Sequence, residues 1–259
     1  MITVQLLGGM GNQMFQCAFA QALQAKGYAV QLDKSMLITG NPHPPIREYS
    51  LDAFGEIPFG NPEGDTIRER SSRYSPENLS PRDPSTMLGY WQSEKYFKDI
   101  ENEVRTSFTF RNRLSNYALE TIREIENSDS IAIHVRRTDF FDHLAFHGMP
   151  TLDYYRESIR LIRSYYPNTK AFVFSDDRQW CRENFPGDFR IVEGRTKHED
   201  LQLMSLCNHI VLANSTFSWW AAWLGDTKAR RIVIAPKNWF APSSGVDTTD
   251  IVPERWMRL

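Results

Sequence analysis

From residue 131 onward, short apolar segments alternate regularly with amphipathic ones. The apolar segments have the length of buried strands and cover 131–135, 171–175, 190–192, 210–213 and 232–235. The segments between them have the apolar spacing of helices, at 153–165, 179–184, 199–208 and 218–224. This alternation predicts a Rossmann-like parallel sheet with helices on both faces, because parallel strands need a crossover connection, usually a helix.

The N-terminal segment has the same plan. An apolar strand is expected at 2–7, a glycine turn at 8–11, a helix at 12–26 and a second strand at 28–32. Eight prolines then make 40–90 a loop-rich region with at most short helices, followed by a strand at 88–91 and one or two helices within 105–127. We therefore expect two α/β domains, 1–128 and 129–259, with a tail after Trp239 that packs back on the first.

Composition limits the class of protein and its partners. The 259 residues are 41% apolar and 24% charged, as in soluble globular proteins, and a formal net charge of −2 gives no basic footprint for nucleic acid. The N-terminus lacks the pattern of a signal peptide, and no apolar run approaches the ~20 residues that span a bilayer. Three cysteines without metal-site spacing suit a reducing cytoplasm, where we expect the protein to act.

Two adjacent arginines, Arg136 and Arg137, follow the predicted strand 131–135 within His134-Val135-Arg136-Arg137-Thr138-Asp139. Ligands of open α/β sheets bind beyond the carboxyl ends of strands, and the arginine fork matches phosphate oxygens. The pattern favours an anion site, in particular for a diphosphate. The alternative is a surface arginine pair that forms salt bridges with Asp139.

Three further motifs lie at predicted strand ends. Gly8–Gln13 is a weak dinucleotide fingerprint, since Met14 stands at the third glycine position, but its amides and the Asn12 and Gln13 side chains could donate to a phosphate; the alternative is a plain turn with an Asn cap. The carboxylates in Phe174–Asp177 could bind ribose, guanine or a divalent metal, or simply cap a helix. Asn214–Ser218 could form a second anion cradle at a helix start, or a common hydroxyl cap.

With these motifs in their order from residue 8 to 220, the chain resembles the bacterial α-1,2-fucosyltransferases of glycosyltransferase family 11. The matching segments are 9–13 (GMGNQ), 47–51 (REYSL), 89–97 (GYWQSEKYF), 134–139 (HVRRTD), 174–177 (FSDD) and 214–220 (NSTFSWW). The segment around the arginines is shared with α-1,6- and protein O-fucosyltransferases, whereas GMGNQ and GYWQSEKYF are more particular to the α-1,2 group. Thr138 departs from the glycine that usually follows the arginines.

The resemblance implies a GT-B fold, with two Rossmann-like domains facing across a cleft. The first would carry a proline-rich acceptor-side insertion and the second would bind GDP. The implied reaction is inverting transfer of L-fucose from GDP-β-L-fucose to the 2-hydroxyl of a β-galactoside, in O-antigen or other surface-oligosaccharide synthesis. No cofactor and no metal would be required.

The resemblance also implies roles for individual residues. Arg136 would clamp the β-phosphate with Ser215 and Thr216, Asp200 would bind guanine, Asn12 would lie beside fucose, and His134 would support the nucleotide side. The full expected donor-binding set is Gly9, Met10, Gly11, Asn12, Gln13, His134, Arg136, Arg137, Ser175, Asp176, Asp177, Asp200, Asn214, Ser215, Thr216 and Phe217. The expected catalytic set is Arg136, Asp139, Asn12 and His134.

The group that accepts the proton of the acceptor hydroxyl is left open. Asp139 is the first candidate, Asp142 and His143 are rivals, and a dissociative mechanism that needs little base is a further alternative. Competing functions are a fucosyltransferase of α-1,6 or protein O-linkage, a non-catalytic nucleotide-sugar-binding protein, and a metal-dependent GT-A enzyme using Asp176 and Asp177. The sequence leaves open whether the acceptor is lipid-linked or a free oligosaccharide, and the oligomeric state.

Overall fold

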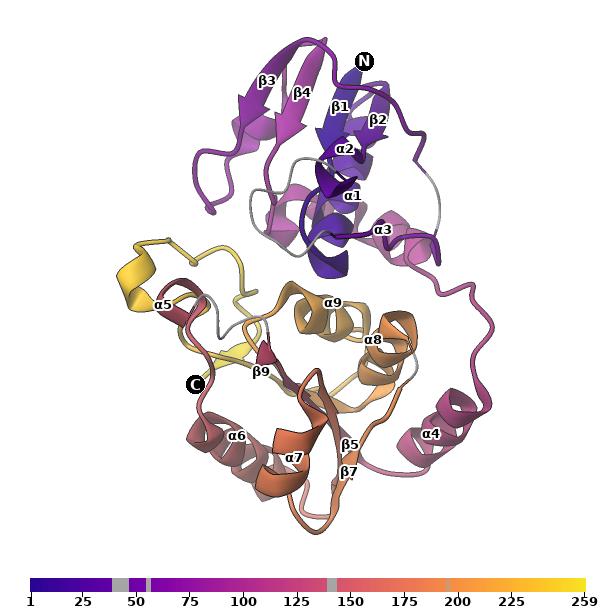
Figure 1. Ribbon diagram of the computed structural model, residues 1–259, viewed down its shortest axis with the longest axis vertical. Coiled ribbons are helices and arrows are strands. Elements are labelled where there is room, and N and C mark those ends of the chain that lie inside the picture. Colours follow the sequence, from indigo (N-terminus) through magenta and orange to yellow (C-terminus); the bar gives the residue numbers. More distant parts are fainter. Residues whose placement is uncertain (39–46, 55–56, 139–143, 195) are drawn as a thin grey trace. The chain divides into compact units, whose positions relative to one another are not determined.

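The computed structural model of the protein describes residues 1–38, 47–54, 57–138, 144–194 and 196–259 (Figure 1). The chain forms two compact units: the N-terminal unit comprises 1–111 with 246–253, and the C-terminal unit 112–245 with 254–259. The division thus falls after Arg111 rather than near 128, because helix α4 (Asn116–Glu126) packs on helix α8 (Lys197–Leu206) of the C-terminal unit. Among the described helices, none has the length and apolar character needed to cross a membrane.

The N-terminal unit has a four-stranded parallel sheet in the order β2-β1-β4-β3. Its strands are β1 (Ile2–Gln5), β2 (Val30–Asp33), β3 (Asp65–Arg68) and β4 (Ser85–Leu88). The crossover from β1 to β2 is α1 (Met10–Ala25), which buries Met14, Phe15, Ala18, Phe19 and Leu23 as its apolar spacing requires. The short helices are α2 (Ser35–Ile38), η1 (Pro76–Leu79), η2 (Glu94–Tyr96), η3 (Lys98–Ile100) and α3 (Glu101–Ser107).

Two expectations for the proline-rich region are corrected. It contains strand β3, which lies at the edge of the sheet and is mostly exposed, so its sequence lacks the apolar run of a buried strand. The strand expected at 88–91 is β4, which ends at Leu88; the next residues form a turn in which the fully buried Trp91 has φ 54° and stacks on Phe19 with ring centroids 4.3 Å apart.

The C-terminal unit has a six-stranded parallel sheet in the order β10-β9-β8-β5-β6-β7. Its strands are β5 (Ser130–Val135), β6 (Lys170–Ser175), β7 (Phe189–Ile191), β8 (His209–Val211), β9 (Val233–Ala235) and β10 (Met257–Arg258). Apart from α4 and α8, its helices are α5 (Leu144–His147), α6 (Leu152–Tyr165), α7 (Arg178–Asn184), α9 (Thr216–Leu224) and η5 (Pro242–Ser244). The predicted alternation of strands and helices is confirmed, whereas the two-residue β10 was not predicted.

Tryptophans fill the core around α9, where they are packing residues. Trp219, Trp220 and Trp223 are buried on this helix, and the Trp219 ring centroid lies 5.4 Å from that of Trp256. A helix that is apolar on all sides is expected to be buried, and α9 is.

The buried Gln16 of α1 holds two segments beside the helix. The Gln16 amide accepts from the Leu7 N–H at 3.1 Å and donates to the carbonyls of Leu7 at 3.3 Å and Gly89 at 3.1 Å. Gln16 therefore joins the segment after β1 to the segment after β4.

We predict that Gln16→Leu lowers the free energy of unfolding by about 2–4 kcal/mol, because it leaves the buried polar groups of Leu7 and Gly89 without this partner. Gln24→Leu, on the exposed side of the same helix, is the control and should change it by less than about 0.5 kcal/mol. Urea unfolding of both variants measures the difference, and equal stabilities would contradict the role assigned to Gln16.

Candidate functional site

The motifs lie at the carboxyl ends of three neighbouring strands of the C-terminal unit. Strand β5 lies between β6 and β8, and all three are parallel. Residues 136–138, 176–177 and 212–215 follow these strands directly. Since Val135 and Ser175 are paired in register, the arginines and the carboxylates leave the sheet side by side.

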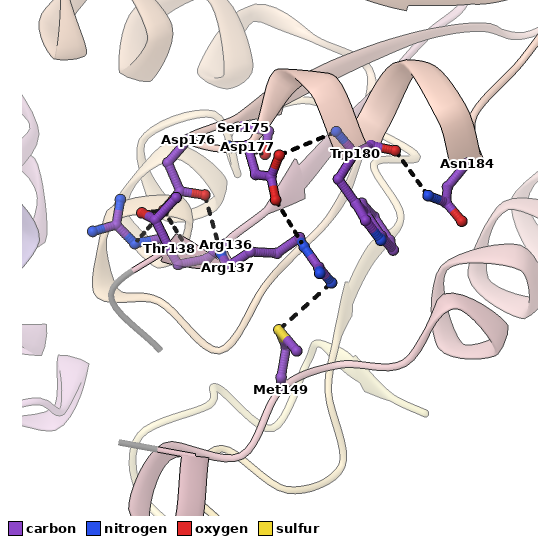
Figure 2. A network of polar contacts seen from close by, with 9 residues as sticks. All are labelled: Arg136, Arg137, Thr138, Met149, Ser175, Asp176, Asp177, Trp180 and Asn184. Atoms are coloured by element: carbon purple, nitrogen blue, oxygen red, sulfur yellow. Dashed lines mark hydrogen bonds and ion pairs between the residues drawn. The ribbon is translucent and has the colours of Figure 1, made fainter. Parts of the chain in front are cut away.

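The Asp176 carboxylate gathers donors from the arginine segment (Figure 2). Its Oδ1 accepts from the Arg137 N–H at 3.0 Å, and its Oδ2 accepts from the Thr138 N–H at 3.2 Å and from the Thr138 hydroxyl at 2.5 Å. The Arg136 Nε lies 3.3 Å from Oδ2. Asp176 therefore holds the loop after β5, and its expected contact with the donor substrate stays a prediction.

Arg137 is enclosed by protein groups. Its Nε lies 3.2 Å from Asp177 Oδ2, its guanidinium lies 4.0 Å from the centre of the Trp180 ring, and its Nη1 is 3.8 Å from Met149 Sδ (Figure 2). Only 16% of the side chain is exposed. Such ion-pair and cation–π contacts hold a guanidinium in place.

Asp177 also caps helix α7. Its Oδ1 accepts from the Trp180 N–H at 3.1 Å, and its own N–H donates to Ser175 Oγ at 2.9 Å. The alternative interpretation of this carboxylate as a helix cap is thereby confirmed. Because its other oxygen pairs with Arg137, binding of ribose by Asp177 would compete with existing contacts.

The Asn214–Phe217 segment begins helix α9. Ser215 is its N-cap and accepts from the Phe217 N–H at 3.3 Å. The Asn214 amide donates to the carbonyls of His147 at 2.8 Å and Trp239 at 3.1 Å, so it ties two other loops to this edge. The alternative of a hydroxyl cap is confirmed, because the Ser215 hydroxyl serves the cap, and anion binding at this helix start stays a prediction.

His134 is buried in strand β5, with its ring 5.7 Å from that of Phe217. The imidazole thus lies beside the first turn of α9. The position agrees with a supporting role beneath the loops.

Asp200 lies on α8 against the segment that follows β7. A Cβ on Gly194 would come within 1.8 Å of Asp200 Oδ1, so the glycine makes room for the carboxylate. The segment is held by Arg178, whose Nη2 donates to the Gly194 carbonyl at 2.9 Å. Burial raises the pKa of Asp200 to about 6, and Oδ1 has no hydrogen-bond partner among the described residues.

The N-terminal unit places the glycine turn at the start of α1. Gly9 is the N-cap, with open space where a Cβ would stand, and Asn12 Oδ1 accepts from Gln92 Nε2 at 2.9 Å. The Gln92 partner comes from the segment after β4, which sequence reasoning did not connect to Asn12. Met10 is buried in the core, so its side chain is a packing group.

Gln13 is fully buried and its side chain is already engaged. It donates to the carbonyls of Gly8 at 3.0 Å and Glu48 at 2.9 Å, and accepts from the Ser50 N–H at 2.9 Å. This corrects the expectation that its side chain offers a donor to a phosphate, since both amide hydrogens are used.

The candidates for proton acceptor, Asp139, Asp142 and His143, lie outside the described residues. Within the described residues, the C-terminal unit offers an arginine held by carboxylates and a capped helix start at the carboxyl ends of its strands, and a half-buried acid on α8. Arginine and helix N-termini suit anions, and such an acid suits a base with paired N–H donors. The arrangement is suited to binding a nucleoside diphosphate.

Comparisons of the sequence with known proteins point the same way. The model of Glycosyl transferase family 11 matches residues 78–259. The chain is 30% identical to an alpha-1,2-colitosyltransferase of Escherichia coli, over 100% of the chain and 98% of that protein. It is 27% identical to the O-antigen biosynthesis glycosyltransferase WbnK of Escherichia coli, covering 98% and 99%. It is also 28% identical to galactoside alpha-(1,2)-fucosyltransferase 2 of Rattus norvegicus, covering 88% and 68%.

Solved structures confirm the predicted GT-B fold class. NodZ alpha-1,6-fucosyltransferase soaked with GDP-fucose matches with a TM-score of 0.51 and 17% identity, over 86% of this chain and 92% of that one. POFUT1 in complex with GDP matches with a TM-score of 0.53 and 12% identity, over 90% and 97%. At such identities the likeness concerns the fold alone.

The raised pKa of Asp200 predicts a pH-dependent effect of Asp200→Asn. The folded pKa of about 6 exceeds the ordinary 3.8, so the native state holds the proton more tightly, and stability falls as pH rises from about 4 to 6. Asn carries no charge and avoids this loss. Its advantage over wild type should be small at pH 4 and grow to at most about 3 kcal/mol at pH 7.

Urea unfolding at pH 4, 5, 6 and 7 measures the difference. Glu183→Gln, an exposed carboxylate on α7, is the control and should not diverge from wild type with pH. A difference between Asp200→Asn and wild type that is the same at every pH would mean that folding does not shift the pKa of Asp200.

Proposed function

We propose that this chain, which belongs to glycosyl transferase family 11, transfers L-fucose from GDP-β-L-fucose to the 2-hydroxyl of a β-galactoside with inversion. The observation that carries the proposal is the arginine loop anchored at the carboxyl edge of the sheet, in a chain whose matched relatives include α-1,2 glycosyltransferases. The E. coli colitosyltransferase favours a second candidate, transfer of colitose, which lacks the 3-hydroxyl of fucose.

Arg136 is the proposed clamp of the β-phosphate. Cleavage of the bond between the sugar and GDP places negative charge on that phosphate while the sugar ring becomes cationic. A guanidinium and the amides at the start of α9 are donors suited to that charge, with Ser215 and Thr216 on the same phosphates.

Asp200 is the proposed guanine ligand. An ionised carboxylate accepts from both the N1–H and the 2-amino group of guanine, a pattern that adenine and uracil do not offer. Burial disfavours the ionised form of Asp200. The two N–H donors of guanine would offset this desolvation cost by hydrogen bonding to the carboxylate.

The reaction is proposed to proceed without a metal. Asp176 and Asp177, the residues that a metal-dependent enzyme would use, lie beside the guanidinium groups of Arg136 and Arg137. These cations oppose binding of a divalent ion at the same oxygens. Turnover that is unchanged in EDTA would support the proposal.

The acceptor and its setting are drawn from the relatives. WbnK takes part in O-antigen biosynthesis and the rat enzyme acts on galactosides, which supports a surface-glycan acceptor ending in galactose. Lipid-linked and free forms of that acceptor fit the proposal equally. A cytoplasmic place of action is proposed with it, because a charged GDP-sugar does not cross a bilayer unaided.

The direct test is transfer by the purified protein from GDP-fucose and GDP-colitose to a panel of β-galactosides, with the linkage read by NMR. We expect an α-1,2-linked product, with fucose preferred. An α-1,6-linked or peptide-linked product would replace the proposed linkage. GDP binding without any transfer would favour a non-catalytic nucleotide-sugar-binding protein.

We predict that Arg136→Ala lowers kcat/KM about 10²–10³-fold, because loss of a charge-assisted phosphate contact costs roughly 2–4 kcal/mol in the transition state. Arg136→Lys should restore little, since a point charge does not replace the planar fork. Arg182→Ala, an exposed arginine of α7 paired with Glu193, is the control and should leave the rate unchanged. Wild-type turnover by Arg136→Ala would contradict the role of Arg136 as the β-phosphate clamp.

Asp139 is proposed as the proton acceptor. Asp139→Asn should lower transfer by roughly 10²–10⁴-fold while slow hydrolysis of GDP-fucose without acceptor persists. Asp153→Asn, on the exposed face of α6, serves as the control. Loss of both hydrolysis and GDP binding would instead assign Asp139 to holding the loop, and would make Asp142 or His143 the better candidate.

A further inference from the structure

We infer that Asp176 is a positioning residue, which acts on the donor diphosphate only by aiming Arg136. This inference rests on the proposed function, because it assigns a part to a residue of the same site. It differs from the expectation that Asp176 touches the ribose or the base.

The contacts of Asp176 converge on one short segment. Two consecutive backbone N–H groups, those of Arg137 and Thr138, donate to its two oxygens, at 3.0 Å and 3.2 Å. Asp176 follows β6 and the segment follows β5, so the carboxylate joins the ends of two neighbouring strands (Figure 2). Its side chain is only 16% exposed. Bonds to successive amides restrict the φ and ψ angles of the residues that carry them, so the loop has a defined direction.

The same carboxylate also orients the Arg136 guanidinium. The Nε atom lies 3.3 Å from Asp176 Oδ2, and Nε carries one of the five N–H donors of an arginine. The other four are on the two Nη atoms, at the far end of the planar group, which is the end that forms bidentate contacts with phosphate. Pairing at Nε fixes the plane of the group before a donor binds. An arginine without this partner would lose rotamer freedom on binding, which weakens affinity.

Thr138 adds a side-chain bond to Asp176. Its hydroxyl donates to Asp176 Oδ2 at 2.5 Å, a contact that the glycine usual at this position could not make. The departure from the family pattern therefore strengthens the hold of Asp176 on the loop. Arg137 anchors the other side of the loop through Asp177 and Trp180.

Isosteric variants separate positioning from direct contact. In Asp176→Asn only one oxygen remains, so the NH₂ group must face either the Arg137 N–H or the donors of Thr138 and Arg136. The negative charge that pairs with the Arg136 guanidinium is lost in both orientations. Thr138→Val removes only the hydroxyl bond, whereas Thr138→Ser keeps it. Glu183→Gln on α7 is the control, since Glu183 accepts from Gln179 on the exposed side of that helix.

The measurement is calorimetric binding of GDP and GMP to each folded variant, together with its melting temperature. GMP keeps the guanine, the ribose and the α-phosphate but lacks the β-phosphate that Arg136 is proposed to clamp. Asp176→Asn should weaken GDP at least tenfold and GMP less than twofold. Thr138→Val should weaken GDP about threefold, while Thr138→Ser and Glu183→Gln should match wild type.

Three results would overturn the inference. Equal weakening of GDP and GMP by Asp176→Asn would mean that Asp176 contacts the nucleoside or supports the whole site. Unchanged GDP affinity would mean that it has no part in binding. If Asp176→Asn does not fold, identical GDP affinities of Thr138→Val and Thr138→Ser would reject the inference. Failure of the wild-type protein to bind GDP would instead reject the proposed function itself.

Discussion

The pairing of two arginines with two carboxylates across the ends of β5 and β6 is the interaction on which the candidate site depends. Adjacent guanidinium groups repel each other, and the register of Val135 with Ser175 sets Asp176 and Asp177 beside them. These pairs are partly exposed and therefore screened, so each contributes on the order of 1 kcal/mol or less to stability. Their importance is geometric, because they determine where Arg136 points.

The same carboxylates neutralise the charge of the arginine loop. With two carboxylates beside two guanidinium groups, the net electrostatic attraction for an anion is modest, so the proposed recognition of a diphosphate would depend on the direction of the N–H groups. The start of α9 adds such groups, and Asn214 ties its loop to the carbonyls of His147 and Trp239. The C-terminal unit thus combines an oriented arginine, an oriented helix start and the half-buried Asp200.

Strands β5 to β9 of the C-terminal unit could be predicted within about two residues because each is rich in apolar residues and lies between polar segments, whereas the two-residue β10 could not. Strand β3 could not, since Asp65–Arg68 contains a single apolar residue and lies at a sheet edge. The segment Leu88–Trp91 has the composition of a strand, but Trp91 adopts a left-handed conformation in order to stack on Phe19, a contact across the fold that local sequence does not reveal.

The motifs of the site were recognisable, but the direction of each side chain was not. Arg136 and Arg137 look equivalent in sequence, yet the Nε of Arg136 pairs with Asp176, whereas Arg137 pairs with Asp177 and lies over the Trp180 ring. Gln13 looked like a phosphate donor, and its partner Glu48 lies 35 positions away in the chain. The contacts of these side chains depend on their neighbours in the folded chain, which motif spacing does not specify.

The most direct measurement is a crystal structure of the protein with GDP. We predict β-phosphate oxygens within hydrogen-bond distance of the Arg136 Nη atoms, Asp176 still bonded to Arg136 and Thr138, and guanine paired with Asp200. A diphosphate bound away from Arg136, or one that displaces the loop from Asp176, would contradict the account.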